Sequence, residues 1–168
     1  MIAGSPIPLR SENLAMTDST RTSLALMLAA LLLFGAAGCQ EASPGISVNI
    51  AAQFRDTAGG TVDLRKAYEA DWDRVCVLGP GSGNGAARRT LGFEWNVDDK
   101  TAIKGNDGIV LLLFVRGKEV VAYAEHPRNL GDFANLSGKC FARESASFYQ
   151  RRQSAPGAVA GMHPKDSP

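Results

Sequence analysis

Cysteine and histidine are scarce in this chain of 168 residues, which has three cysteines and two histidines. No Cys-x-x-Cys motif is present, and no cysteine and histidine have the short spacing of a metal-binding motif. An excess of charge of one sign is also absent, because the formal net charge is only +1. Such a balance gives no field that would attract nucleic acid or anionic lipid. We therefore expect no metal site and no nucleic-acid partner.

One long uncharged run, residues 24–37, follows Arg21 and ends in small residues just before Cys39. A basic start, an apolar middle and a small-residue end are typical of a secretory signal peptide. The run is shorter than the roughly 20 apolar residues of a membrane span, and it has no polar face at helical spacing. We predict a signal peptide over residues 1–38, with an uncleaved anchor or a core helix as alternatives. Met16 would begin a more compact signal, so we expect translation to start there.

The letters Leu-Phe-Gly-Ala-Ala-Gly-Cys that end at Cys39 resemble the lipobox of bacterial lipoprotein precursors. Ala36 departs mildly from this pattern, since the family prefers leucine there. The resemblance implies that acyl chains are attached to Cys39 after cleavage, so that the mature protein is held on a membrane. Gln40 follows the cysteine in place of aspartate, which by resemblance to enterobacterial sorting favours the outer membrane. We therefore expect a lipid-anchored protein of the bacterial cell envelope, facing the periplasm.

Two cysteines remain after lipidation, Cys76 and Cys140. An even pair in a small exported domain is typical of a disulfide, because the compartment is oxidising. Closing so long a loop would stabilise the fold by roughly 4 kcal/mol in the chain-entropy model. A redox or nucleophilic pair is the alternative interpretation.

Hydrophobic periodicity divides the remaining chain into a linker over residues 39–45, a domain over 46–150 and a disordered tail over 151–168. Period-two alternation in residues 46–54 predicts a strand. The apolar run 109–115 and the alternating run 119–125 predict a hairpin. Further strands are expected at 74–78 and 139–150, and short helices after Asp63 and at 86–91. The sum is a small α+β domain with a largely antiparallel sheet of four to five strands and one or two helices on one face.

A glycine-rich loop over residues 79–86 joins a predicted strand to a predicted helix. Its letters fit a dinucleotide fingerprint, in which backbone N–H groups reach a phosphate at the start of a helix. No acidic residue follows at the expected distance, and no phosphate-binding lysine is present. We therefore expect a flexible loop and no cofactor. The alternative is a surface that binds an anion or a peptide, made by Gly81, Gly83, Gly85, Arg88 and Trp95.

Acidic residues and one histidine are the remaining candidates for catalysis. Asp71 and Asp73 flank a tryptophan, and Glu94 precedes another, as two acids of a glycosidase would. The chain has no nucleophile-elbow motif whose serine could act together with His126. We expect no catalytic residue. A small periplasm-facing hydrolase that uses His126 and nearby acids stays an alternative.

Residues 71–79, residues 91–95 and the apolar hairpin resemble parts of uncharacterised small bacterial lipoproteins. The resemblance extends over residues 62–149 and implies no activity. We expect a non-catalytic binding or structural module whose partner is an envelope protein or the cell wall. Such a module would expose an aromatic or apolar patch that includes Trp95, Phe141 or Tyr149. An envelope inhibitor that offers residues 79–85 to a hydrolase is a further alternative.

Overall fold

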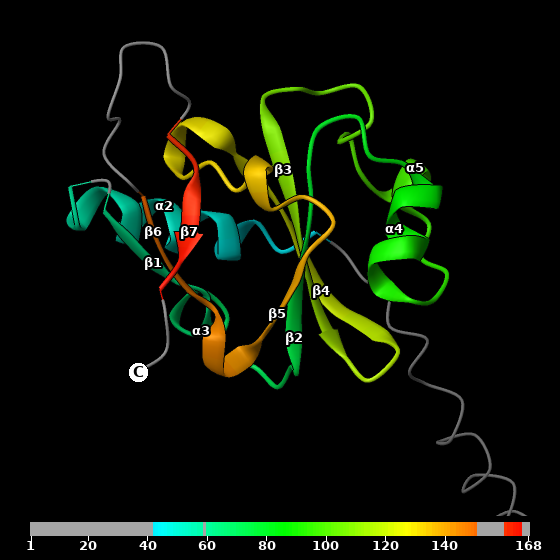
Figure 1. Ribbon diagram of the computed structural model, residues 1–168, viewed down its shortest axis with the longest axis horizontal. Helices are drawn as coiled ribbons and strands as arrows, with labels where there is room; N and C mark the ends of the chain where they lie inside the picture. The colour runs from blue at the N-terminus through cyan, green and yellow to red at the C-terminus, as the bar shows by residue number, and fades with distance from the viewer. Residues whose placement is uncertain (1–41, 59, 151–159, 166–168) are drawn as a thin grey trace, which may run out of the picture. The chain divides into compact units, whose positions relative to one another are not determined.

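The computed structural model describes residues 42–58, 60–150 and 160–165 (Figure 1). The expected signal segment and Cys39, the expected lipidation site, lie outside the described residues. The described α-helices are α2 (Pro44–Asp56), α3 (Leu64–Ala67), α4 (Asn84–Leu91) and α5 (Val97–Lys100). The described strands are β1 (Thr61–Asp63), β2 (Arg74–Leu78), β3 (Ile109–Arg116), β4 (Glu119–Pro127), β5 (Cys140–Ala142), β6 (Ser147–Gln150) and β7 (Met162–Pro164). Short 3-10 turns are η1 (Arg128–Leu130), η2 (Ala134–Leu136) and η3 (Arg143–Ser145).

The larger sheet has four antiparallel strands in the order β4-β3-β2-β5. The predicted hairpin of β3 and β4 makes up one half of it, with β4 at the edge, and turns at Gly117 with φ +58°. Glycine adopts this left-handed conformation without the steric cost that a side chain would bring. The α+β fold class that the sequence predicts is therefore confirmed.

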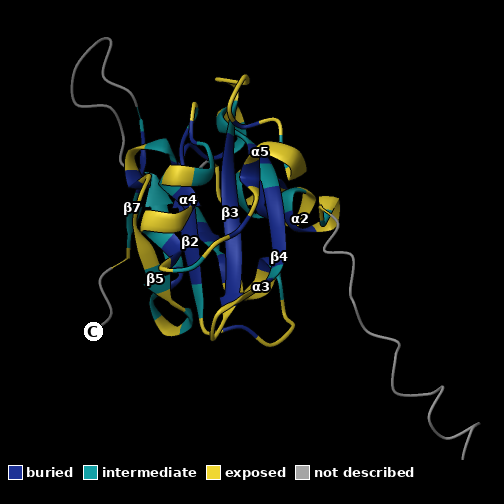
Figure 2. Ribbon diagram, turned by 90° about the vertical axis from the view of Figure 1, so that its right-hand side faces the viewer, coloured by how far each residue is buried: buried dark blue, intermediate teal, exposed yellow. Residues whose placement is uncertain are grey.

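Helices cover both faces of this sheet, where the sequence analysis expects them on one. Figure 2 shows that burial is concentrated in β2, β3 and β4. Alternate residues of these strands belong to two separate apolar clusters, one under α2 and α3 and one under α4 and α5. A strand buried on both sides must be apolar throughout, which explains the unbroken run Val110 to Val115.

Residues 46–54 form part of a helix, so the predicted strand is wrong. Pro44 occupies the first helical turn, where its missing N–H costs nothing. Ile46 and Ile50 lie one turn apart and are buried, whereas Val48 is 62 % exposed. In a strand, these three residues would share one face. The alternation of apolar residues fits both a strand and a helix, but burial of Ile46 and Ile50, four residues apart, is the pattern of a helix.

The smaller sheet has the order β1-β6-β7 and corrects the prediction of a disordered tail. Residues 151–159 and 166–168 lie outside the described residues, but Met162–Pro164 pair with β6. Met162 is completely buried, and its N–H donates to the carbonyl of Asp132. The mainly polar composition of residues 151–168 gives no sign that Met162 is buried against the domain.

The predicted linker over residues 39–45 is wrong in its second half. Ala42 forms a parallel bridge with Tyr123 on β4, and Ser43 N donates to Tyr123 O at 3.0 Å. Pro44 then begins α2. The described part of this segment is therefore built into the domain.

Cys76 and Cys140 form the predicted disulfide. They face each other directly across β2 and β5, so the bridge holds the edge strand β5 to the sheet. Cys76 is completely buried, while Cys140 is exposed. Within the described ranges, no helix has the length and apolar character to cross a membrane.

Candidate functional site

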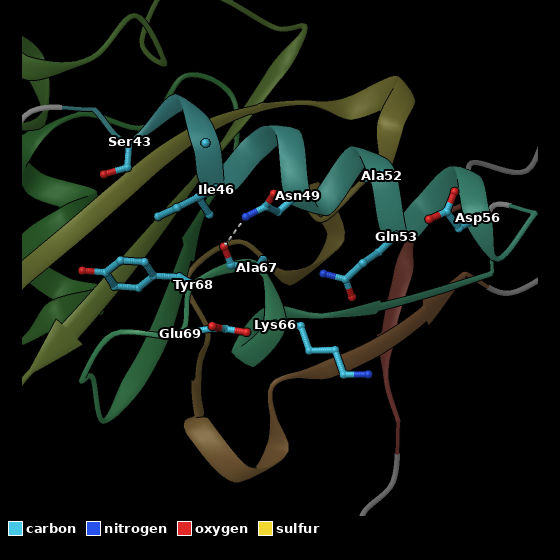
Figure 3. A pocket seen from close by; sticks show the side chains of 11 residues that line it. Ser43, Ile46, Asn49, Ala52, Gln53, Asp56, Lys66, Ala67, Tyr68 and Glu69 are labelled. Atoms are coloured by element: carbon cyan, nitrogen blue, oxygen red, sulfur yellow. Dashed lines mark hydrogen bonds between the residues drawn. The ribbon is translucent and has the colours of Figure 1, made fainter.

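A groove of about 640 Å³ lies between α2 and the α3 segment (Figure 3). Ser43 and Tyr68 lie at one end of it, and Asp56 and Lys66 lie at the other. The lining residues are Ser43, Gly45, Ile46, Asn49, Ala52, Gln53, Asp56, Lys66, Ala67, Tyr68 and Glu69. The groove is therefore open and lined by both polar and apolar groups, with charged side chains of both signs.

Two amide side chains of α2 fix the opposite wall of the groove. Asn49 Nδ2 donates to Ala67 O at 3.1 Å (Figure 3). Gln53 makes a pair of bonds with the backbone of Asp63, donating to its O at 3.1 Å and accepting from its N at 2.8 Å. Asp63 itself caps α3 by accepting from Arg65 N. The groove walls are thus held by backbone-directed hydrogen bonds, while the side chains of Lys66 and Glu69 are exposed.

Asp63 places a negative charge beside this wall of the groove. Burial raises its pKa, but the hydrogen bonds and charge of Arg65 outweigh burial and hold the pKa of this carboxyl below its usual value. Arg65 Nη2 lies 2.8 Å from Asp63 Oδ2. The carboxylate therefore stays ionised and acts as the N-cap of α3.

The glycine-rich loop has internal partners for its polar groups. Gly79 N donates to Ser137 Oγ at 2.8 Å, and Gly81 N donates to Ile103 O at 3.0 Å. Asn84 Oδ1 accepts from the N–H groups of Val97 at 2.7 Å and of Asp98 at 3.1 Å, which ties α4 to the start of α5.

Gly83 is the N-cap of α4, and the carboxylate of Asp98 lies against it. A Cβ added to Gly83 would be 2.9 Å from Asp98 Oδ1. The start of a helix favours negative charge. No side chain caps the helix by a hydrogen bond, but the Asp98 carboxylate places a negative charge beside its N-cap residue.

The other residues predicted to form a binding surface with the glycine-rich loop have other surroundings. Arg88 is exposed, and its Nε lies 3.3 Å from Glu94 Oε1. Gly85 is exposed on α4, and a Cβ added to it would meet Arg89 Nη1 at 3.6 Å. Trp95 is 8 % exposed, with its ring edge-on to Tyr123 at 5.2 Å, so it is a core residue.

The other two aromatic candidates are partly buried as well. Phe141 packs edge-on to Phe148, with ring centroids 5.0 Å apart, and Tyr149 lies 5.8 Å from the ring of His163. Val48 is the exposed large hydrophobic residue of the described chain. The described surface therefore has no aromatic patch of the expected kind.

His126 is completely buried and lies far from the acids with which a hydrolase would combine it. It pairs with Val110 at one end of the hairpin. Asp73 Oδ2 accepts from Gly117 N at the opposite end. Asp71 Oδ2 likewise lies near Arg116 Nη1, at 3.5 Å. The strand between these ends is roughly 20 Å long, so the structure does not bring His126 and these acids together.

His126 instead bridges two segments. Its Nδ1 lies 3.0 Å from Ser47 Oγ on α2, and its Nε2 lies 3.1 Å from Leu130 O on η1. Burial lowers the pKa of His126, and the bond to Leu130 O opposes this only in part. In the described ranges, no three potential metal-ligating side chains come together.

The sequence pattern predicts a strand where α2 forms, so the groove residues are not among the sequence-based candidates. Asn49 and Gln53 then appear as solvent-facing alternates. The signals that could have found them are Ser43-Pro44, which is typical of a helix start, and the spacing of four between the two amides. No family model, curated protein or solved structure matches this chain.

Proposed function

We propose that this chain is a lipid-anchored protein of the bacterial cell envelope whose domain binds another envelope polypeptide without catalysing a reaction. The apolar run that ends in Ala-Gly-Cys39 supports the anchor. The disulfide between Cys76 and Cys140 supports export, since such bonds persist in oxidising compartments. The groove between α2 and α3 supports binding.

The shape and lining of the groove favour a polypeptide as the ligand. Pockets for small molecules enclose most of the ligand and are mainly apolar. This groove is open, and its rim has the charges of Asp56, Lys66 and Glu69. Protein interfaces that form and separate have a polar rim of this kind. This is the observation on which the binding proposal depends.

Site-directed photo-crosslinking in the native envelope tests the binding site. A photoreactive residue at Ala52 should capture a discrete partner, and the same residue at Arg89 on α4, which packs on the other face of the sheet, should not. Ala52 lines the groove, and both positions are exposed. Equal capture at both positions, or none at Ala52, would contradict the groove as the binding surface.

A charge reversal separates specific binding from proximity. Lys66→Glu should reduce crosslinking from Ala52 at least severalfold, because it removes a cation from the rim. Lys118→Glu makes the same change in the turn between β3 and β4 and should have no effect. Both lysines are exposed, so neither substitution should disturb the core.

A further inference from the structure

The chain enters the folded domain at a fixed point on β4. Ala42 bridges Tyr123, and Ser43 N donates to the same residue at 3.0 Å. The helix that follows is held by Ile46 and Ile50, which are 3 % and 0 % exposed. Any force on the N-terminal end of Ala42 is therefore transmitted to the sheet and not absorbed by a loose segment.

Covalent geometry limits how far this point can lie from a lipid on Cys39. Three residue steps separate Cys39 from Ala42, and a fully extended chain covers at most about 3.6 Å per residue. Ala42 therefore lies within roughly 11 Å of the acylated cysteine, whatever conformation residues 39–41 adopt.

We infer that the β4 edge and the N-terminal half of α2 form a membrane-apposed surface, on which the domain rests against the bilayer. This inference rests on the proposed lipidation at Cys39. It replaces the picture of a domain held away from the membrane by a linker. The partner of this surface is the lipid headgroup layer to which the acyl chains of the same molecule attach.

Helix α2 follows β4, so that more than one residue comes near the bilayer. Ser43 bonds Tyr123, and one turn later Ser47 bonds His126, three residues further along the strand. Val48 follows Ser47 on this helix, and its 62 % exposure is unusual for an apolar side chain in this domain. A headgroup layer offers this side chain a less polar environment than water does.

The start of α2 is joined at the same edge by the end of α5. Tyr123 Oη donates to Lys100 O at 3.2 Å, and Lys100 is exposed. The opposite edge of the sheet is β5, three strand spacings away. At about 4.8 Å per spacing, β5 lies roughly 14 Å farther from the bilayer when β4 faces it.

This placement orients the groove and the disulfide relative to the bilayer. The groove between α2 and α3 begins at Ser43 and Gly45, so one of its ends opens near the membrane surface. The exposed Cys140, on β5, lies on the edge that faces away. A partner that binds the groove would therefore be held close to the bilayer.

Depth measurements on the mature lipoprotein test the inference. Single cysteines would be introduced by Val48→Cys, Lys100→Cys and Glu144→Cys and labelled with a fluorophore. The protein would be purified from bacterial membranes, and its acylation verified by mass spectrometry. It would then be incorporated in vesicles of phosphatidylethanolamine and phosphatidylglycerol that contain a nitroxide on the headgroup. Labels at positions 48 and 100 should be quenched at least twofold more than the label at position 144.

A lengthened tether provides the control. Inserting about 20 Gly-Ser residues between Gln40 and Glu41 should abolish this difference and leave acylation intact. Equal quenching at all three positions in the acylated protein without the insertion would overturn the inference, while the proposed lipid anchor would stand. Absence of acyl chains in the mass spectrum would overturn both. A twofold difference that persists with the long tether would show intrinsic affinity of this surface for lipid, and would support it.

Discussion

Ser47 Oγ on α2 donates a hydrogen bond to Nδ1 of His126 on β4, over 3.0 Å. The direction follows from the other ring nitrogen, because Nε2 lies 3.1 Å from Leu130 O, and a carbonyl can only accept. Nε2 therefore bears the proton, and Nδ1 of the neutral ring is the acceptor. This pair joins the helix, the strand and η1 in one buried contact.

We expect the domain to lose stability as the pH falls through the range in which free histidine titrates. Burial lowers the pKa of His126 below its usual value of 6.5, so the folded state favours the neutral ring. Above pH 6.5 both states are neutral and the full stability is present. Below that pH the unfolded chain takes up the proton first, and the free energy of unfolding falls until the lower folded pKa is reached. Urea denaturation at pH 5 and at pH 7.5 measures this loss.

His126→Gln should flatten this pH dependence, because glutamine cannot titrate. His163→Gln, at the second histidine of the chain, is the matched control and should leave the pH dependence as it is. If the pH dependence disappears with His163→Gln and not with His126→Gln, His126 is not its source and the expectation is contradicted. Side-chain carboxylates contribute at lower pH, so the comparison is restricted to pH 5 and above.

A pair of alanine substitutions in α2 distinguishes the helix from the strand that the alternating pattern predicts. Ile50→Ala should lower the free energy of unfolding by about 2–5 kcal/mol, since it removes a fully buried side chain. Val48→Ala should change it by less than about 0.5 kcal/mol, as an exposed position does. In a strand both residues would share one face, and similar losses would contradict the helix.

A hydrophobic pattern predicts the secondary structure of this chain only where it fits one kind of structure and not two. The hairpin of β3 and β4 was predictable because seven successive apolar residues cannot form an amphipathic helix of a small domain. Residues 46–54 were not, because valine and isoleucine at alternate positions also fit a helix with one residue exposed. The helix formed because Ile46 and Ile50 meet the sheet and Pro44 starts the turn.

Sites that depend on long-range packing were less predictable than the disulfide. An even number of cysteines and the expected oxidising compartment were sufficient to predict the pairing of Cys76 with Cys140. Nothing local to Gly83 indicates that Asp98 folds against it. The burial of Trp95 depends in the same way on a distant strand, through Tyr123. The groove requires α3 to pack beside α2, a contact between segments that the sequence assigned to different kinds of structure.

Removal of the disulfide should destabilise the domain by up to about 4 kcal/mol, the loop-closure value for a separation of 64 residues. The double variant Cys76→Ala, Cys140→Ala should show this loss in urea denaturation. The wild type after full reduction is the control and should lose a similar amount. A loss below about 1 kcal/mol in both would show that β5 remains on the sheet without the bond.

Crowding between Gly83 and Asp98 should appear as non-additive stability. Gly83→Ala places a methyl group 2.9 Å from Asp98 Oδ1 and should destabilise the domain by about 1–3 kcal/mol. Asp98→Ala in the same chain should reduce that cost, because the contact is removed. A double-mutant cycle with urea denaturation measures the coupling. Strict additivity would contradict direct contact between these two residues.

Nucleotides should not bind at the glycine-rich loop. The carboxylate of Asp98 lies against Gly83 at the start of α4, and Lys104 Nζ lies 3.4 Å from its Oδ2. A phosphate would therefore meet a negative charge where a nucleotide site offers bare N–H groups. NAD, FAD and ATP, each titrated into residues 39–168 with Cys39→Ser, should leave the melting temperature unchanged. Saturable stabilisation of about 2.7 kcal/mol, the value for a ligand at 100 times its dissociation constant, would contradict this expectation. Such a result, if abolished by Gly83→Ala, would place the ligand at this loop and favour an enzyme over a binding module.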